Sequence, residues 1–314
     1  ALIFFSLLFI QEIYMAAYSM LISYLMILII LVIIYKNYIA NIILKVPHPR
    51  LYKPLLLFSL PLLFTDIASL VMVNTDTIML GYYLPSYSVG YYNAAFLLMH
   101  FIPIIHNSLS VIYMPVATGL VAKEAYDDIR NLYLCVTKWM FFLTFPLFII
   151  FLLFPSETLS IIFSGSYKEA ATALALLSIA EFVNVVLGPN SHSIIAFGKT
   201  RILLAGYLIS GILNIILNYI LIPRMGLNGA AIATAVSLVF VNMFNSSYLI
   251  LKFRIHPFGR SYSFPLVILV ISTCILYYPL YYLVEFNNWF IFLCYPIFLV
   301  LGVLLVLITK SYSE

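Results

Sequence analysis

The chain has 314 residues, of which 65% are apolar and only 8% are charged, and its formal net charge at pH 7 is +4. These few polar side chains cannot cover a water-soluble globule of this size, so the composition predicts an integral membrane protein. Lipid offers no hydrogen-bond partners to the backbone, and the long unbroken apolar runs favour helices over barrel strands. We therefore predict an all-α, multi-pass fold. The small excess of Lys and Arg does not indicate nucleic acid, because cytoplasmic loops of membrane proteins collect these residues.

The chain opens with ten residues, 1–10, that are nearly all apolar but too few to cross a bilayer, which needs about 20. No initiator Met and no basic leader precede them, so we interpret them as the stub of a helix and expect a longer parent protein. Runs of spanning length follow, and they predict nine complete transmembrane helices at about 13–35, 54–80, 90–117, 139–155, 170–196, 202–222, 229–251, 264–284 and 288–309.

The positive charges support this count and predict an orientation. Of the 15 Lys and Arg, all but Lys168 and Arg224 follow the first, third, fifth, seventh or ninth span. Cytoplasmic loops are enriched in Lys and Arg, so the C-terminus is expected in the cytoplasm.

Nothing in the loops suggests catalysis. No loop is long enough to fold as a soluble domain, and no external loop carries paired acids. Cys135, Cys274 and Cys294 stand singly in apolar runs without metal-ligand spacing, so neither a metal site nor a disulfide is expected. We predict that the protein is not an enzyme. A membrane-embedded glycosyl-transfer enzyme is the alternative from a different class.

Acidic residues at membrane depth are the first candidates for function, because they are costly in lipid and usually face a cavity or a partner. Asp66 lies about half-way along the span 54–80, and Asp76 lies near its external end. Ten positions place these two side chains about 80° apart around a helix, so they are not expected to pair. Each is a candidate for binding a coupling cation or proton.

A third acid lies on a polar stripe of the span 170–196. Glu181, Asn184 and His192 share one helical face with Gly188, where Gly188 and Pro189 are expected to interrupt the helix. A broken helix beside a buried carboxylate is how many transporters build an ion site, so we add these residues to the coupling candidates. The alternative is a protonated carboxyl that is hydrogen-bonded to a neighbouring helix. Beyond such a Na⁺ or H⁺, no cofactor is expected.

Two further polar groups are expected to serve packing. In the span 90–117, His100 and Asn107 share a stripe, whereas His106 points elsewhere; interhelical hydrogen bonds explain such residues without a ligand. In the span 202–222, Asn214 and Asn218 lie one turn apart, and Thr234 belongs to a strip of small residues on the following helix. Small residues allow close backbone approach and asparagines bond across the contact, which predicts a tightly packed helical hairpin.

This hairpin carries the pattern N-x-x-L-N-x-x-L-I-P, then G, then G-A-A-x-A-T, between Asn214 and Thr234. A second pattern runs from Phe58 to Ala95, with an early proline, the segment Asp76 to Gly81, and then G-Y-Y-N-A-A. In this order, the two patterns resemble the polysaccharide-transporter branch of the multidrug/oligosaccharidyl-lipid/polysaccharide flippase superfamily. The resemblance covers about residues 50 to 250.

The resemblance implies a MATE-like fold, with two six-helix lobes in a V and often two further helices. On that plan, residues 1–50 would be the end of the first lobe, with a partial helix five, helix six and a cytoplasmic linker. Residues 51–253 would be the second six-helix lobe. Residues 254–314 would hold two C-terminal transmembrane helices and a short cytoplasmic tail.

The resemblance also implies a function in the cell membrane. A flippase of this branch moves a polyprenyl- or dolichyl-linked oligosaccharide from the inner to the outer leaflet by alternating access, for surface polysaccharide or glycan assembly. Its partners would be that substrate, membrane lipids, and polysaccharide polymerisation or glycosylation machinery. A cation-coupled multidrug exporter of the same superfamily is the alternative among transporters.

One feature departs from this expectation. A phosphate head group should meet Arg or Lys, yet the sequence predicts no basic residue deep in any span. Either the head-group site lies in the first lobe, or Lys138, Lys199 and Arg201 receive the head group at the cytoplasmic rim.

Overall fold

The computed structural model describes residues 13–43, 52–163 and 165–257, and also 271, 273, 279, 281, 282, 284 and 296–300. Every regular element in these residues is a helix, which confirms the all-α class. The predicted stub at 1–10 lies outside the described residues, as do most of the predicted spans 264–284 and 288–309. The chain divides into two compact units, Ala1–Leu57 and Phe58–Glu314.

The first unit contains α2 (Ile13–Ile43). Its 31 residues extend past the predicted span 13–35 and give a helix about 46 Å long, enough to cross a hydrocarbon core of about 30 Å. Most of its described side chains are apolar and exposed. Such a helix needs lipid or protein around it.

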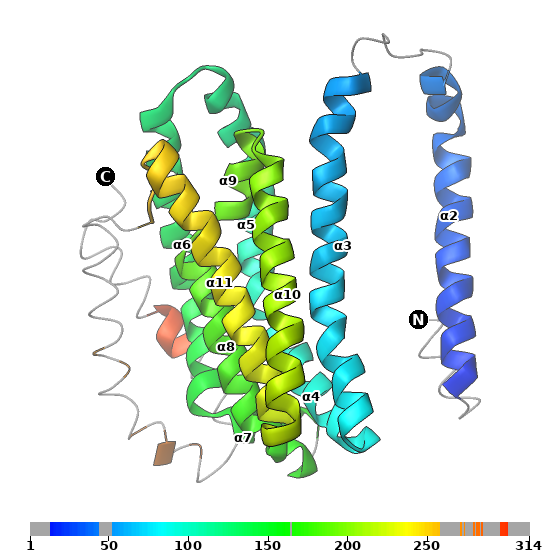
Figure 1. Cartoon of the computed structure of the whole chain (residues 1–314), viewed down its shortest axis with the longest axis vertical. Helices are drawn as coiled ribbons and strands as arrows, with labels where there is room; N and C mark the ends of the chain where they lie inside the picture. Colours follow the sequence, from blue (N-terminus) through cyan, green and yellow to red (C-terminus); the bar gives the residue numbers. More distant parts are fainter. Residues whose placement is uncertain are drawn as a thin grey trace. The chain divides into compact units, whose positions relative to one another are not determined.

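The helices of the second unit follow one another along the chain with short connections (Figure 1). They are α3 (Tyr52–Tyr83), which begins just before the unit boundary, α4 (Ser86–Met99), α5 (Ile102–Ala122), α6 (Tyr126–Leu153), α7 (Pro155–Ile162), the 3₁₀ helix η2 (Gly165–Ala170), α8 (Ala171–Val186), α9 (Asn190–Ala196), α10 (Thr200–Met225) and α11 (Leu227–Phe253).

Six segments within residues 52–257 are long and apolar enough to cross a membrane: Tyr52–Tyr83, Ile102–Ala122, Tyr126–Leu153, Gly165–Val186, Thr200–Met225 and Leu227–Phe253. Each corresponds to one of the six spans predicted between residues 54 and 251. The protein is therefore a multi-pass membrane protein.

Two of the predicted spans are broken. The span 90–117 consists of α4 and α5, which meet at His100 and Phe101. The span 170–196 consists of α8 and α9, separated by residues 187–189. Gly188 has φ of +72°, a conformation that a residue with a Cβ rarely adopts. The predicted interruption at Gly188 and Pro189 is confirmed.

Aromatic side chains fill the core between α6 and α8. Phe148 of α6 stacks on Phe182 of α8 with ring centroids 3.9 Å apart, and Phe141 and Phe145 contact the same ring. These rings bury a large apolar area and hold α8, which carries Glu181, in a fixed position.

Helices α10 and α11 lie side by side as an antiparallel hairpin (Figure 1). Gly226, with φ of +57°, forms the turn between them. The helices approach so closely that a Cβ on Gly229 would lie 2.4 Å from the carbonyl oxygen of Leu221. The hairpin is thus as tightly packed as its small residues predict.

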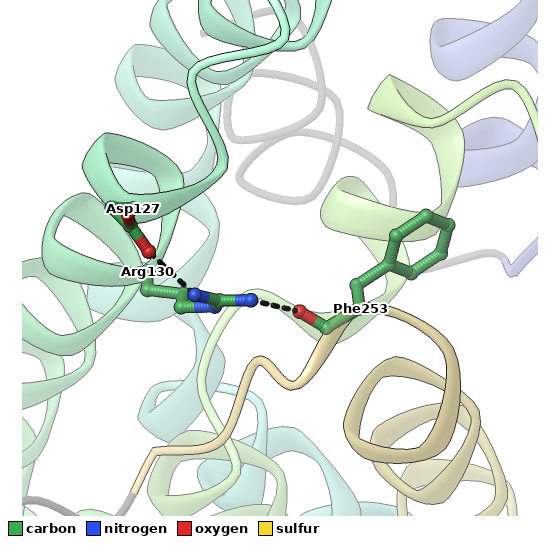
Figure 2. A network of polar contacts seen from close by, with 3 residues as sticks. All are labelled: Asp127, Arg130 and Phe253. Atoms are coloured by element: carbon green, nitrogen blue, oxygen red, sulfur yellow. Dashed lines mark hydrogen bonds and ion pairs between the residues drawn. The ribbon is translucent and has the colours of Figure 1, made fainter.

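The opposite end of α11 is held by an arginine from the start of α6 (Figure 2). Arg130 forms an ion pair with Asp127 and donates from Nη2 to the carbonyl oxygen of Phe253 at 3.2 Å. Phe253 is the last residue of α11, whose final carbonyls have no partner within the helix. The cation therefore caps the helix and holds the ends of α6 and α11 together.

Candidate functional site

The most completely buried acid of the described residues is Asp76 on α3, with 0% of its surface exposed. Its Oδ1 atom accepts two amide hydrogen bonds from α10, from Nδ2 of Asn218 at 2.6 Å and from Nδ2 of Asn214 at 3.3 Å. Its Oδ2 atom accepts the hydroxyl of Tyr92 of α4 at 2.6 Å and the hydroxyl of Thr234 of α11. A carboxylate has about four acceptor positions, so these four donors saturate it.

The donors also contact one another. Nδ2 of Asn218 donates to Oδ1 of Asn214 at 3.1 Å, and Nδ2 of Asn214 donates to Oγ1 of Thr234 at 3.1 Å. We call Asp76, Tyr92, Asn214, Asn218 and Thr234 the Asp76 cluster. It joins α3, α4, α10 and α11.

One atom of the Asp76 cluster stands out. The Oδ1 atom of Asn218 is buried and has no hydrogen-bond donor among the described residues. Buried acceptors are nearly always paired, so this oxygen, which belongs to the amide whose Nδ2 donates to Asp76, is an unsatisfied acceptor of the cluster.

The structure therefore unites two groups that the sequence suggested for different roles. Asp76 was a coupling candidate, whereas Asn214, Asn218 and Thr234 were packing candidates, and the structure places all four in contact. Tyr92 was missed as a member. The spacing of the two asparagines, one turn apart, was the signal that could have marked a shared ligand.

Glu181 lies in a second polar region, on α8. Its side chain is 9% exposed, and Oε2 accepts Nδ2 of Asn184 at 3.2 Å. His100, at the end of α4, interacts electrostatically with this carboxyl. The structure thus brings Glu181 and Asn184 together, as their helical spacing predicted.

His192 lies beyond the break, on α9, and its ring faces another histidine. The ring centroids of His192 and His106 are 6.4 Å apart. As expected, His106 points away from the stripe of His100 and Asn107, which are exposed; it is buried against the broken helix, with Nε2 3.3 Å from the carbonyl oxygen of Gly188. The carbonyl oxygen of Gly188 also accepts the backbone N–H of Asn190 at 2.7 Å, so the break leaves it paired.

Asp66 and Asp76 point to different regions, as their spacing predicted. Asp66 is exposed, whereas Asp76 is fully buried. Asp66 is therefore an exposed candidate that lies outside the Asp76 cluster.

Exposed polar side chains occur on α3, α4 and α5, among exposed apolar ones such as Ile67. Asn74 of α3, Asn93 and His100 of α4, and Asn107 of α5 are all exposed. Thr77 of α3 donates to Oδ1 of Asn93 at 3.1 Å and ties α3 to α4 at this surface. We refer to these exposed polar residues, together with Asp66, as the polar face of the second unit.

The basic candidates occupy two kinds of position. Lys199 and Arg201 are exposed at the start of α10. Lys138 was expected at a helix end, but α6 begins at Tyr126, so Lys138 lies about 18 Å into the helix and is buried. The expected rim position of Lys138 was wrong. The charged residues at 127–130 were expected to lie outside the helix, whereas they belong to its first turns, where Ile129 and Tyr133 are buried.

Within the described part of the chain, no group of three or more His, Cys, Asp or Glu side chains is placed to hold a metal ion.

A family model described as a polysaccharide biosynthesis protein matches residues 2–172. A probable low-salt glycan biosynthesis flippase, Agl15, of Haloferax volcanii is 27% identical over 177 residues, which are 55% of this chain and 37% of that protein. The teichuronic acid biosynthesis protein TuaB of Bacillus subtilis is 29% identical over 142 residues, 45% of this chain and 28% of its own.

An uncharacterized membrane protein of Methanocaldococcus jannaschii is 25% identical over 69% of this chain and 45% of its own length. Among solved structures, the lipid II flippase MurJ in an inward closed conformation matches with a TM-score of 0.59 and 17% identity, over 85% of this chain and 56% of that one. The two chains share a fold. This chain spans less than half the length of the curated relatives it matches.

Proposed function

The chain belongs to the polysaccharide biosynthesis protein family whose model covers more than half of it, and from this premise we propose that it is part of a flippase. Its substrate would be a polyprenyl- or dolichyl-linked oligosaccharide, moved from the inner to the outer leaflet for surface polysaccharide or glycan assembly. The flippase name of one relative supports this substrate class. The proposed location is the cell membrane, with lipids and polymerisation or glycosylation machinery as partners.

The observation that carries this proposal is the polar face. Asp66 is exposed half-way along α3, a helix that is otherwise apolar enough to span the membrane. A carboxylate at that depth is costly in hydrocarbon and almost always faces a water-filled cavity or a protein partner. Sugars and phosphate need such a hydrophilic path, because they cannot cross about 30 Å of hydrocarbon unaided. We assign the polar face to one wall of that path.

The proposed architecture has residues 51–253 as a six-helix second lobe, preceded by the end of a first lobe at 1–50 and followed by two helices at 254–314. The six spanning segments within 52–257 supply the number of helices that one lobe requires. The C-terminus is proposed to lie in the cytoplasm. The contact of Arg130 with Phe253 supports this orientation, because it puts two of the Lys- and Arg-rich connections at one end of the lobe.

We propose a coupling cation, Na⁺ or H⁺, as the driving ion. Asp76 is the first candidate site, because it is a fully buried carboxylate and its partner Asn218 has a buried oxygen without a donor among the described residues. Glu181, Asn184 and His192 form the second candidate, at the broken helix that transporters use for ion sites, and the exposed Asp66 is the third. Lys199 and Arg201 remain candidates for head-group contact at the rim, and Lys138 for contact within the lobe.

A cation-coupled multidrug exporter is the second candidate function, favoured by the acids Asp66 and Glu181 near the polar face. A membrane-embedded glycosyl-transfer enzyme is the alternative from a different class.

The function is tested by deleting the gene in the source organism and comparing this strain with the same strain complemented by the full-length gene. The flippase proposal expects lipid-linked glycan to accumulate in the cytoplasmic leaflet without the gene, and drug sensitivity to stay unchanged. Altered drug sensitivity with normal glycan would support the exporter. Full-length protein carrying Asp76→Asn or Glu181→Gln then tests coupling: transport that ignores both substitutions and both the Na⁺ and proton gradients excludes it.

A further inference from the structure

The short helix α9 lies between two glycines that both have a left-handed backbone. Gly188 precedes α9 with φ of +72°, and Gly198 follows it with φ of +70°. Glycine adopts positive and negative φ about equally readily, so these two positions can change φ at little cost and let α9 turn as one body. The helix packs against α5, α10 and α11, at the end of the second unit where α10 begins (Figure 1).

Polar side chains hold α9 against α11. The Nδ2 atom of Asn190 donates to Oδ1 of Asn242 and to Oγ of Ser246, both at 3.2 Å. In the other direction, Nδ2 of Asn245 donates to Oγ of Ser191 at 3.3 Å, while Oδ1 of Asn245 is buried without a donor among the described residues. Such bonds between helices are weak, and water can replace each of them. This contact can therefore open without exposing a large apolar surface.

The contact of α9 with α5 is also polar. The hydroxyl of Tyr113 and Oγ of Ser193 are 2.7 Å apart, and both side chains are buried. Since Oγ of Ser193 donates to the carbonyl oxygen of Pro189 at 2.9 Å, the phenol is the donor in this pair. Ile194 is the only fully buried apolar residue of α9. Apolar packing thus contributes little to holding this helix.

An aromatic stack closes the end of α9. The ring of Phe197 stacks on Phe253, the last residue of α11, with centroids 3.8 Å apart. It also lies parallel to Tyr126, the first residue of α6, at 6.4 Å. The exposed Lys199 and Arg201 follow directly. A movement of α9 would therefore separate the ends of α6 and α11 at a basic end of the unit.

We propose that α9 is a gate at the cytoplasmic end of the second unit. It turns about Gly188 and Gly198, and its polar side chains exchange their partners on α5 and α11 for water. The ring of Phe197 leaves that of Phe253 in the same movement. This inference rests on the proposed flippase function and orientation, because alternating access requires an opening at the inner leaflet.

The experiment uses the full-length protein in inverted and in right-side-out membrane vesicles, with single cysteines in an otherwise cysteine-free background. Ser193→Cys reports on α9. Ser178→Cys is the matched control, because both serines are 0% exposed and Ser178 lies on α8, before the break. The rate of labelling by a membrane-impermeant maleimide is measured. We expect Ser193→Cys to be labelled from the cytoplasmic side only, and Ser178→Cys from neither side.

A second reporter guards against a local defect at Ser193. Asn190→Cys leaves the pair of Ser193 and Tyr113 unchanged, and Asn190 is only 2% exposed. It is expected to be labelled from the cytoplasmic side as well.

Gly198→Ala tests the hinge. A Cβ at Gly198 would meet open space, so the positive φ is the only obstacle, and it penalises the position that α9 has in the structure. The substitution should raise the labelling rate of Ser193→Cys about tenfold and leave Ser178→Cys unlabelled. Gly119→Ala on α5 is the control, because Gly119 also meets open space and does not have a positive φ. It should leave the rate unchanged.

Four results overturn the inference. Protection of both Ser193→Cys and Asn190→Cys shows that α9 stays in place. Equal labelling of Ser178→Cys shows a general loosening of the unit, and labelling from the outer side alone puts the opening at the wrong end. A rate in Gly198→Ala no higher than in Gly119→Ala removes the hinge. In each case, accumulation of lipid-linked glycan in the deletion strain would still support the flippase.

Discussion

Asp76 of α3 and Asn218 of α10 are both fully buried, and the Nδ2 atom of Asn218 donates to Oδ1 of Asp76 at 2.6 Å. This bond and its three companions hold four helices together, so the carboxyl should matter for stability as well as for coupling. An interhelical hydrogen bond within a membrane averages about 0.6 kcal/mol, and an unpaired buried donor costs about 1 to 3 kcal/mol.

We therefore expect Asp76→Ala, which leaves four donors without their acceptor, to lower the free energy of unfolding by about 2 to 4 kcal/mol. Asp76→Asn keeps one acceptor oxygen and should cost only about 1 kcal/mol. Unfolding of the full-length protein in detergent measures both. Equal stability of the two variants would show that the cluster does not hold the helices.

The close approach of α10 and α11 predicts a large effect for one added methyl group. A Cβ at Gly229 would lie 2.4 Å from Leu221 O and 2.6 Å from Leu221 C, which are backbone atoms that cannot turn aside. Gly229→Ala should therefore destabilise the protein by about 1 to 3 kcal/mol. Gly211→Ala is the control, because its Cβ would meet only Ala68 O at 4.0 Å. That change should be neutral or slightly stabilising, and thermal unfolding of both variants decides.

The break between α8 and α9 makes a prediction with a rescue. At Gly188, the positive φ strains any L side chain by about 1 to 2 kcal/mol, and a Cβ would lie 2.1 Å from Oγ1 of Thr137. We expect Gly188→Ala to destabilise clearly, and Thr137→Ala to restore only part of the loss in the double variant. The two free energies of unfolding should therefore be non-additive. Full additivity would mean that Thr137 is not the obstacle.

Arg130 offers a prediction about charge and capping. Its partner Asp127 is 90% exposed, and such surface pairs contribute almost nothing, so Asp127→Asn should leave stability unchanged. The bond from Arg130 to the carbonyl of Phe253 is different, because it satisfies the end of α11. Arg130→Gln should cost about 1 to 2 kcal/mol. Increased proteolysis near residue 254 in the Arg130→Gln variant alone would localise the effect.

The sequence determined much of the architecture because the bilayer limits what a chain can do. Backbone groups must bond within helices and each crossing needs about 20 apolar residues, so the spans from α3 to α11 could be predicted. The break at Gly188 and Pro189 could also be predicted, since these residues act on their own backbone. The helix at 155–162 and the early start of α6 could not be predicted. Both segments contain polar residues that are typical of loops, and their helical structure depends on packing against other helices.

Contacts between helices were decided only by the tertiary structure. Asp76 was recognisable as a costly acid, but Tyr92 follows it by 16 residues, Asn214 by 138 and Thr234 by 158. The helical period of a sequence shows which side chains share a face of one helix. It does not show which face of another helix packs against them. Hydrogen bonding in a low-dielectric interior selects those partners, because every buried donor must find an acceptor wherever the fold supplies one.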